Sequence, residues 1–171
     1  MKVLICKDHL SATERVAGLI ADHLRKRPGA VLGLATGGTM LPLYRRLIAS
    51  HEEGLSFAGA TTFNLDKYVG LAPDHPASYH SYMRKALFDH VDIDPARTHL
   101  PRGDAADPTA AALDYEARIA RAGGISLQLL GIGRNGHIGF NEPISSLASP
   151  TRVKDPDRKH APRQSGLFRP G

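Results

Sequence analysis

The sequence predicts an α/β fold with an open, mostly parallel sheet flanked by helices, of the Rossmann-like type. Short apolar runs alternate with amphipathic stretches along the chain, which is typical of strand–helix units. Neither an internal repeat nor an interdomain linker interrupts this alternation. The chain has 171 residues, of which 42% are hydrophobic, and that is enough for one domain with its own core. We therefore expect a single domain over residues 1–154 and an irregular, basic tail over residues 155–171.

Four apolar runs are expected to form strands: residues 2–6, 31–35, 61–64 and 125–131. The second run is apolar on both sides, as in a strand that is buried between helix layers. Cys6 lies in the first run and is interpreted as a packing residue rather than a nucleophile. Because it is the single cysteine, it excludes an internal disulfide and favours a reducing, cytoplasmic setting.

Four stretches with helical spacing of apolar residues are expected to connect these strands: residues 11–27, 41–53, 78–88 and 109–122. Ser11 and Glu14 have the spacing of a capping box, in which each side chain satisfies a free backbone N–H at a helix start. Pro28 and Gly29 then end that helix. Residues 66–76 follow neither period, and we expect them to be irregular.

The distribution of charge excludes a nucleic-acid reader. Residues 151–171 contain six Arg or Lys and two Asp, so they supply +4 of the net charge of +5. A protein that reads nucleic acid carries its charge on a folded face, whereas residues 1–150 are near neutral. The apolar run at the N-terminus is too short for a signal-peptide core, and no stretch could span a bilayer. We expect neither nucleic acid nor a membrane as partner.

Three polar clusters directly follow expected strands: Thr36–Thr39, Asn64–Tyr68 and Gly133–Glu142. Ligands of open parallel sheets bind beyond the carboxyl ends of the strands, so we expect all three clusters at one edge of the sheet. The first cluster comprises Thr36, Gly37, Gly38 and Thr39. Its glycines and the free N–H groups of the next helix suit a phosphate, although an ordinary turn between strand and helix would look the same.

The other two clusters contain groups that can transfer protons. Asp66 stands at the end of a strand, where a carboxylate is well placed to act as a base; alternatively, it caps a turn or pairs with Lys67. The third cluster brings Asn135, His137 and Glu142 together within a glycine-rich segment. A histidine oriented by a carboxylate can shuttle protons near neutral pH, and the alternative is a histidine that only binds loop carbonyls. The remaining histidines show no metal-ligand spacing.

Six ordered segments resemble the glucosamine-6-phosphate deaminase family. They are LATGGT (Leu34–Thr39), FNLDKYVGL (Phe63–Leu71), HPASYHSYM (His75–Met83), FDHVDI (Phe88–Ile93), GIGRNGHIGFNEP (Gly131–Pro143) and SSLASPTRVK (Ser145–Lys154). The resemblance covers about residues 1 to 154. It implies isomerisation and deamination of glucosamine 6-phosphate to fructose 6-phosphate and ammonium, in aminosugar catabolism, with no metal or organic cofactor.

The resemblance also implies a role for each matching residue. Asp66 would take the proton at C2, and His137 would open the pyranose ring. Asn135 and Glu142 would orient His137, and the Thr36–Thr39 turn would hold the 6-phosphate. Some members have an aspartate where this chain has asparagine at 135, so a charge that stabilises an imidazolium would have to come from the glutamate.

Two further implications concern regulation and assembly. Ser145, Arg152 and Lys154 match positions that form an allosteric aminosugar-phosphate site in hexameric relatives. They are therefore candidate regulatory residues, and a homo-oligomer is a further expectation. Lys67 replaces an acidic residue found in some members, and the sequence assigns no effect to this difference.

The resemblance stops at Lys154, whereas the family continues through further strand–helix units. We consider a truncation or a shift of the reading frame. The peptide from Asp155, back-translated and read one base later, gives Thr-Leu-Thr-Ala-Asn-Thr-Leu-Arg-Ala-Asn, which looks like the family's continuation. Two alternatives to the deaminase stay open. One is a 6-phosphogluconolactonase, which shares the fold but typically follows its histidine with Thr-Ala-Ser-Leu-Phe-Pro. The other is an inactive, truncated fragment that binds sugar phosphates.

Overall fold

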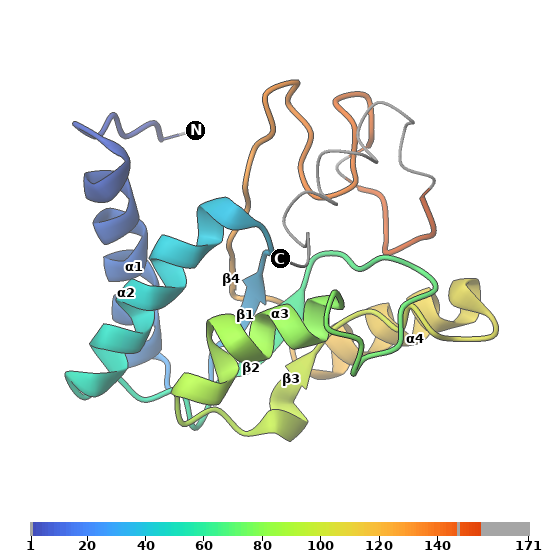
Figure 1. Cartoon of the computed structure of the whole chain (residues 1–171), viewed down its shortest axis with the longest axis horizontal. Helices are drawn as coiled ribbons and strands as arrows, with labels where there is room; N and C mark the ends of the chain where they lie inside the picture. The colour runs from blue at the N-terminus through green and yellow to red at the C-terminus, as the bar shows by residue number, and fades with distance from the viewer. Residues whose placement is uncertain (1, 147, 155–171) are drawn as a thin grey trace.

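The structure, a computed structural model, describes residues 2–146 and 148–154 (Figure 1). The expected tail over residues 155–171 lies outside the described residues. In chain order the elements are α1 (His9–Lys26), β1 (Val31–Leu34), the 3₁₀ helix η1 (Gly38–Met40), α2 (Leu41–Glu52), β2 (Thr61–Asn64), α3 (Tyr79–Ala86), the 3₁₀ helices η2 (Phe88–His90) and η3 (Pro95–Arg97), β3 (Thr98–His99), α4 (Pro108–Arg121) and β4 (Leu127–Gln128).

The four strands form one parallel sheet in the order β3-β2-β1-β4. The central pair is in register along its whole length, from Val31 opposite Thr61 to Leu34 opposite Asn64. Since all strands run in the same direction, their carboxyl ends meet at one edge of the sheet. The predicted α/β fold with a parallel sheet is confirmed.

Helices cover both faces of the sheet (Figure 1). Alternate residues of a strand point to opposite faces. Leu32 and Leu34 therefore join the core under α1, α2 and α3, while Val31 packs with Phe63 and with Tyr115 of α4 on the other face. All four residues of β1 are buried, as expected for a strand between two helix layers.

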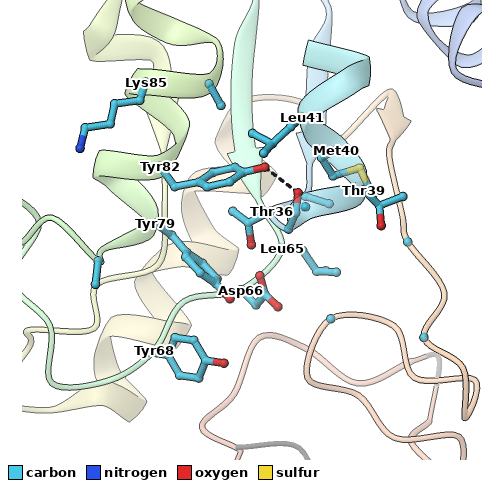
Figure 2. A pocket seen from close by; sticks show the side chains of 18 of the residues that line it. Thr36, Thr39, Met40, Leu41, Leu65, Asp66, Tyr68, Tyr79, Tyr82 and Lys85 are labelled. Carbon is cyan, nitrogen blue, oxygen red and sulfur yellow. Dashed lines mark hydrogen bonds between the residues drawn. The ribbon is translucent and has the colours of Figure 1, made fainter. Parts of the chain in front are cut away.

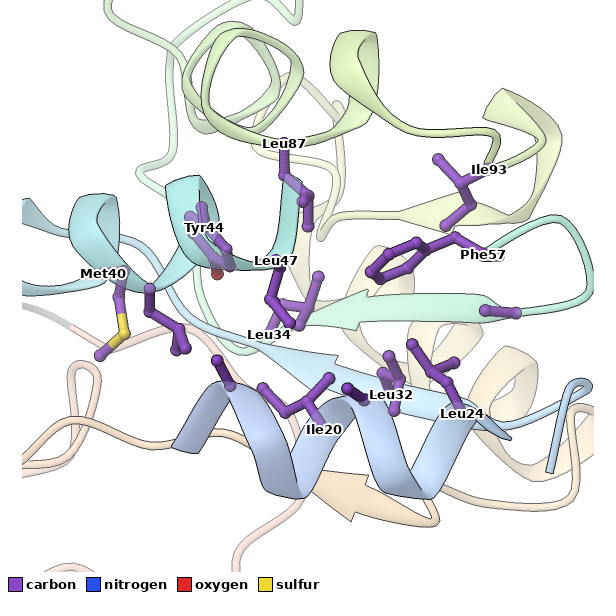
Figure 3. Packing of buried hydrophobic residues seen from close by; sticks show 14 of the residues in the cluster. Ile20, Leu24, Leu32, Leu34, Met40, Tyr44, Leu47, Phe57, Leu87 and Ile93 are labelled. Carbon is purple, nitrogen blue, oxygen red and sulfur yellow. The ribbon is translucent and has the colours of Figure 1, made fainter. Parts of the chain in front are cut away.

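The larger core lies between the sheet and the first three helices (Figure 3). Ile20 and Leu24 of α1 contribute from one side, and Tyr44 and Leu47 of α2 from the other, all packed against Leu34 of β1 and its neighbours. Each of these side chains is at most 4% exposed. Burying one such apolar side chain stabilises the fold by roughly 1.5–3 kcal/mol.

The prediction of a strand over residues 2–6 is wrong. These residues form no strand, and Val3, Leu4 and Ile5 are exposed, with Ile5 at 96%. Cys6 is half-buried rather than part of a buried strand. An apolar run becomes a strand only where a neighbour offers unpaired N–H and C=O groups, and in the described residues both edges of the sheet are strands of only two residues.

The first helix begins before the predicted capping box. Its N-cap is Asp8, whose carboxylate accepts a hydrogen bond of 2.7 Å from the Ser11 N–H. Asp is among the best N-cap residues, because its side chain accepts from a free N–H of the first turn. Glu14 instead forms an ion pair with Arg46 of α2, at 2.9 Å.

The three other predicted helices are confirmed close to their expected bounds. The Ser78 hydroxyl caps α3 by accepting from the Ser81 N–H, and Asp107 caps α4. No helix within the described part of the chain is long and apolar enough to cross a membrane.

The last predicted strand is shorter than expected. Only Leu127 and Gln128 of the expected residues 125–131 are strand, although the N–H groups of Ser126 and Leu129 also donate to β1 carbonyls. Because β1 ends at Leu34, the residues after Leu129 have no further β1 residue with which to pair. The sequence analysis did not predict β3, whose two residues are too few to show a period.

Burial predicts that two leucines of α1 differ in their effect on stability. Leu24 is 2% exposed and Leu19 is 49% exposed. Leu24→Ala should lower the free energy of unfolding by about 2–4 kcal/mol, because it leaves a cavity in the core. Leu19→Ala, the matched control in the same helix, should cost less than about 1 kcal/mol. Urea denaturation of both variants measures this, and equal losses would contradict the described packing of α1.

Candidate active site

A cavity of about 810 Å³ opens at the carboxyl ends of β1, β2 and β4 (Figure 2). Four segments line it: the turn after β1 (Thr36, Gly37, Gly38, Thr39), the segment after β2 (Leu65, Asp66, Tyr68), helix α3 (Tyr79, Tyr82, Lys85) and the loop after β4 (Gly131, Gly133, His137, Gly139). All three polar clusters singled out in the sequence therefore contribute to one edge of the sheet. The parallel direction of the strands produces this convergence.

The turn after β1 leads into the start of the 3₁₀ helix η1, where backbone N–H groups lack intrahelical acceptors. Gly37 has φ 124° and ψ 162°, a conformation that residues with a Cβ rarely adopt. The 3₁₀ helix η1 follows and leads directly into α2. The first N–H groups of a helix have no intrahelical partner, and they lie at the positive end of its dipole. An anion such as a phosphate fits this end of the cavity.

Two tyrosines hold the backbone of this turn from different helices. The Tyr44 hydroxyl, from α2, donates to the carbonyl of Ala35. The Tyr82 hydroxyl, from α3, donates to the carbonyl of Gly37 at 2.7 Å (Figure 2). The hydroxyls of Tyr44 and Tyr82 thus hold the backbone of this turn, in addition to the hydrogen bonds of η1.

Asp66 is the carboxylate of the cavity. The Leu65 N–H still donates to the Leu34 carbonyl, at 3.1 Å, so Asp66 stands just beyond the last rung of the sheet. Burial raises its pKa from 3.8 to about 6, since a desolvated carboxylate is less stable than its neutral form. The alternative that Asp66 pairs with Lys67 is wrong, because the buried Lys67 ammonium makes no hydrogen bond within the described residues.

Asn135 links His137 to Glu142. Its side-chain N–H donates to Glu142 Oε2 at 2.9 Å, and its Oδ1 lies 2.5 Å from His137 Nδ1. A carboxylate only accepts hydrogen bonds, so the amide nitrogen must face Glu142 and the amide oxygen must face the imidazole. In the neutral ring Nδ1 therefore carries the proton and Nε2 carries the lone pair.

Two glycines allow the His137 loop to fold so closely. A Cβ on Gly133 would lie 2.1 Å from Cε1 of His137. A Cβ on Gly139 would lie 2.7 Å from Cδ2 of Leu65, and Gly139 also has φ 58°. The loop thus packs the imidazole on its own backbone and approaches the segment that carries Asp66. Both contacts explain why the segment is rich in glycine.

The sequence analysis missed the aromatic wall of the cavity. The ring centroid of Tyr68 lies 5.5 Å from that of Tyr79 and 4.9 Å from that of Phe140. Burial raises the pKa of all three cavity tyrosines, that of Tyr82 to about 12, so their hydroxyls stay protonated at neutral pH. The spacing of Tyr79 and Tyr82, three residues apart on one helix, is the signal that could have found them.

Among the described residues that line the cavity, Asp66 is the sole carboxylate and Lys85 the sole lysine or arginine. Figure 2 shows the Lys85 ammonium directed away from Asp66. No three His, Cys, Asp or Glu side chains in residues 2–146 and 148–154 gather closely enough to hold a metal ion. The cavity lining therefore combines a turn suited to an anion, tyrosine hydroxyls, and two groups, Asp66 and His137, whose chemistry allows proton transfer.

The three candidate regulatory residues lie outside the cavity lining. Arg152 donates to Asn141 Oδ1 at 2.8 Å, which ties it to the loop of His137. The Ser145 N–H donates to the carbonyl of Glu142 at 2.8 Å. Lys154 is exposed. Within the described residues no hydrogen bond or ion pair joins these three side chains, and their regulatory role stays a prediction.

Comparisons with known proteins agree with this geometry. The family model for glucosamine-6-phosphate isomerases/6-phosphogluconolactonase matches residues 9–140. The chain is 56% identical to the glucosamine-6-phosphate deaminase of Shewanella loihica over 155 residues, and 57% identical to that of Rhodopirellula baltica over 156 residues. These alignments cover 90% and 91% of this chain but only 58% and 62% of those proteins. The chain thus spans about three fifths of the length of these curated relatives.

Solved structures give the same picture. A monomeric glucosamine-6-phosphate deaminase matches with a TM-score of 0.94 and 45% identity, over 98% of this chain and 70% of that one. A 6-phosphogluconolactonase from Thermotoga maritima matches with a TM-score of 0.66 and 22% identity, over 81% of this chain and 63% of that one. The second likeness shows a shared fold alone.

The burial of Asp66 predicts an unusual titration. Its carboxyl should titrate near pH 6 by ¹³C NMR, whereas Asp114, whose pKa is lowered by the hydrogen bond from Arg118, should titrate below 3.8. Because the folded-state pKa of Asp66 is raised, its ionisation costs stability as the pH rises from 3.8 through 6. Asp66→Asn should therefore raise the free energy of unfolding by about 1–3 kcal/mol at about pH 8 and by nothing near pH 3.8. An ordinary titration of Asp66 would refute this.

The Asn135 contact predicts the tautomer of His137. Once the ring is neutral, ¹⁵N NMR should find its proton on Nδ1. Asn135→Ala removes the acceptor that fixes it, so the ring should then populate both tautomers. Asn135→Asp, which keeps an acceptor at this position, is the control and should retain the proton on Nδ1. A wild-type ring protonated mainly at Nε2 would contradict the described contact.

Proposed function

The chain belongs to the family of glucosamine-6-phosphate isomerases and 6-phosphogluconolactonases, and we propose that it follows the deaminase chemistry of that family. The proposed reaction converts glucosamine 6-phosphate and water into fructose 6-phosphate and ammonium. One observation carries the proposal: the cavity joins the Thr36–Thr39 turn, the half-buried Asp66 and His137, which Asn135 contacts. The reaction needs an anchor for the phosphate, a base for carbon and a group that moves protons between oxygens.

The phosphate anchors the sugar in this proposal. The N–H groups of Gly38 and Thr39 at the start of η1 bind its oxygens, and the hydroxyls of Thr36 and Thr39 line the same end of the cavity. The sugar then extends towards Asp66 and His137. Fixing the substrate at one end converts the proton transfers at the other end into reactions between neighbouring groups.

His137 opens the pyranose ring. Its Nε2 lone pair accepts the proton of the anomeric hydroxyl, and the resulting imidazolium returns a proton to the ring oxygen as the C1–O5 bond breaks. Asn135 holds Nδ1 at 2.5 Å, so the ring keeps one orientation through both transfers. Glu142 supports this cycle through its hydrogen bond with the Asn135 amide, since a nearby negative charge favours the imidazolium.

Asp66 acts on the open-chain sugar. It removes the proton at C2, the electron pair of the C–H bond forms a double bond between C1 and C2, and the π pair of the C1 carbonyl moves to its oxygen, which takes a proton from water. A proton then adds to C1, which leaves an imine at C2, and water hydrolyses this imine to the ketone and ammonium. With a pKa of about 6, Asp66 is charged at neutral pH yet more basic than an ordinary carboxylate, which suits abstraction from carbon.

Sequence around His137 favours deamination over lactone hydrolysis. The residues that follow it, Ile138-Gly139-Phe140-Asn141-Glu142-Pro143, include the glutamate that binds Asn135. The relatives that match at 56% and 57% identity are deaminases, whereas the lactonase match of 22% identity supports only the fold. A phosphorylated sugar substrate and a single cysteine fit a cytoplasmic enzyme of aminosugar catabolism. One structural relative is a monomer, so the proposed chemistry needs no second copy of the chain.

The proposal predicts ammonia release by the purified 171-residue chain. Asp66→Asn and His137→Gln should each lower kcat by about 10²–10⁴-fold, because each removes a proton-transfer group. The value of kcat/KM should fall as the pH drops through about 6, where Asp66 becomes protonated. Asp114→Asn, an exposed change on α4, should retain wild-type turnover.

Two assays separate the competing functions. Ammonia release from glucosamine 6-phosphate and hydrolysis of 6-phosphogluconolactone are measured side by side on the same folded sample, with circular dichroism as the check of folding. Lactone hydrolysis without ammonia release would replace the proposal with the lactonase. A folded chain that performs neither reaction would leave the inactive sugar-phosphate-binding fragment as the correct reading.

A further inference from the structure

Helix α3 reaches across the cavity to the turn that follows β1. The Tyr82 hydroxyl donates to the carbonyl oxygen of Gly37 at 2.7 Å, across 45 residues of sequence (Figure 2). The same oxygen accepts the Met40 N–H at 3.0 Å. Both lone pairs of this carbonyl are therefore engaged, and one of the two donors comes from a different part of the chain.

This contact adds a second hydrogen bond to a peptide group that otherwise only the Met40 N–H holds. Gly37 and Gly38 are consecutive glycines, and glycine populates positive and negative φ about equally. The peptide between them can therefore turn over at little cost unless something holds it. A trans peptide is planar, with its C=O and N–H pointing in opposite directions. Holding the Gly37 carbonyl thus sets the direction of the Gly38 N–H.

The direction of the Gly38 N–H matters for an anion in the cavity. Gly38 is the first residue of η1, where N–H groups have no partner within the helix. If the peptide turned over, the Gly37 carbonyl oxygen would replace this N–H and would repel a phosphate. The two arrangements therefore differ in which partial charge faces the ligand.

We propose that Tyr82 is a positioning residue for phosphate: its hydroxyl holds the Gly37–Gly38 peptide with the N–H directed at the phosphate of the sugar. This role rests on the proposed function for its substrate, but it concerns only the phosphate end of the cavity. Burial raises the pKa of the Tyr82 phenol to about 12, so the hydroxyl remains a donor over the working pH range. The Tyr82 ring contributes packing, and its hydroxyl strengthens the orientation that the Met40 N–H also supports.

Tyr82→Phe in the full chain separates these two contributions. The variant keeps the ring and loses the donor, so the dissociation constants of inorganic phosphate and of fructose 6-phosphate, measured by calorimetry, should rise about 3- to 10-fold, the equivalent of one hydrogen bond. KM for glucosamine 6-phosphate should rise by a similar factor while kcat changes less than 2-fold by the same reasoning. Affinity for glucosamine, which has no phosphate, should not change.

Tyr115→Phe is the matched control. Its hydroxyl donates to the carbonyls of Asn64 and His99 on the other side of the sheet, and its loss should leave phosphate affinity unchanged. A ¹⁵N-edited NMR titration gives a second readout that needs no turnover. Phosphate should shift the Gly38 amide resonance strongly in the wild type and in Tyr115→Phe, and weakly in Tyr82→Phe.

The outcomes distinguish this inference from the proposed function. A wild type that binds phosphate but releases no ammonia refutes the deaminase, while weaker phosphate binding by Tyr82→Phe still supports the positioning role. Unchanged phosphate affinity in Tyr82→Phe overturns that role. It is also overturned by equal losses for glucosamine and for phosphate, or by a wild type that does not bind phosphate.

Discussion

The last rung of the β1–β2 pair, where Leu34 stands opposite Asn64, positions most of the candidate site. Beyond this rung the chain leaves the sheet in two directions, into the turn that suits a phosphate and into the segment that carries Asp66. Parallel hydrogen bonding forces both exits to the same edge. A shift of register by one residue would move every side chain of a strand to the opposite face, so the buried pattern of the strands also fixes where Asp66 emerges.

The third part of the site depends less on the sheet and more on its own loop. The strand that precedes it, β4, has two residues, and His137 lies nine residues beyond them. Its geometry comes from local contacts instead: Gly133 accommodates the imidazole, and Asn135 connects the ring to Glu142. The amide transmits orientation without bringing a full charge next to the ring.

The described lining of the cavity contains few charged side chains, and Asp66 is its carboxylate. Burial gives that carboxylate its basicity. The same burial destabilises the folded state when Asp66 is ionised, which is a cost that functional sites commonly carry. Tyrosine hydroxyls lie in the same cavity, and one of them, that of Tyr82, donates to the Gly37 carbonyl in the turn after β1. Stability of the scaffold has to come from elsewhere, chiefly from the core under α1, α2 and α3.

The sequence by itself determined the elements whose signal is local. The central strands are short apolar runs, the helices α2, α3 and α4 have clear periods, and the polar clusters directly follow the strands. Tertiary structure decided those features that depend on a contact with another segment of the chain. Residues 2–6 have an apolar pattern but no strand beside them, Asp8 rather than Ser11 caps α1, and β3 is too short to show a period. The contact of Tyr82 with the turn after β1 joins residues 45 positions apart, and the burial that raises the pKa of Asp66 exists only once the sheet, α3 and the glycine-rich loop come together around it.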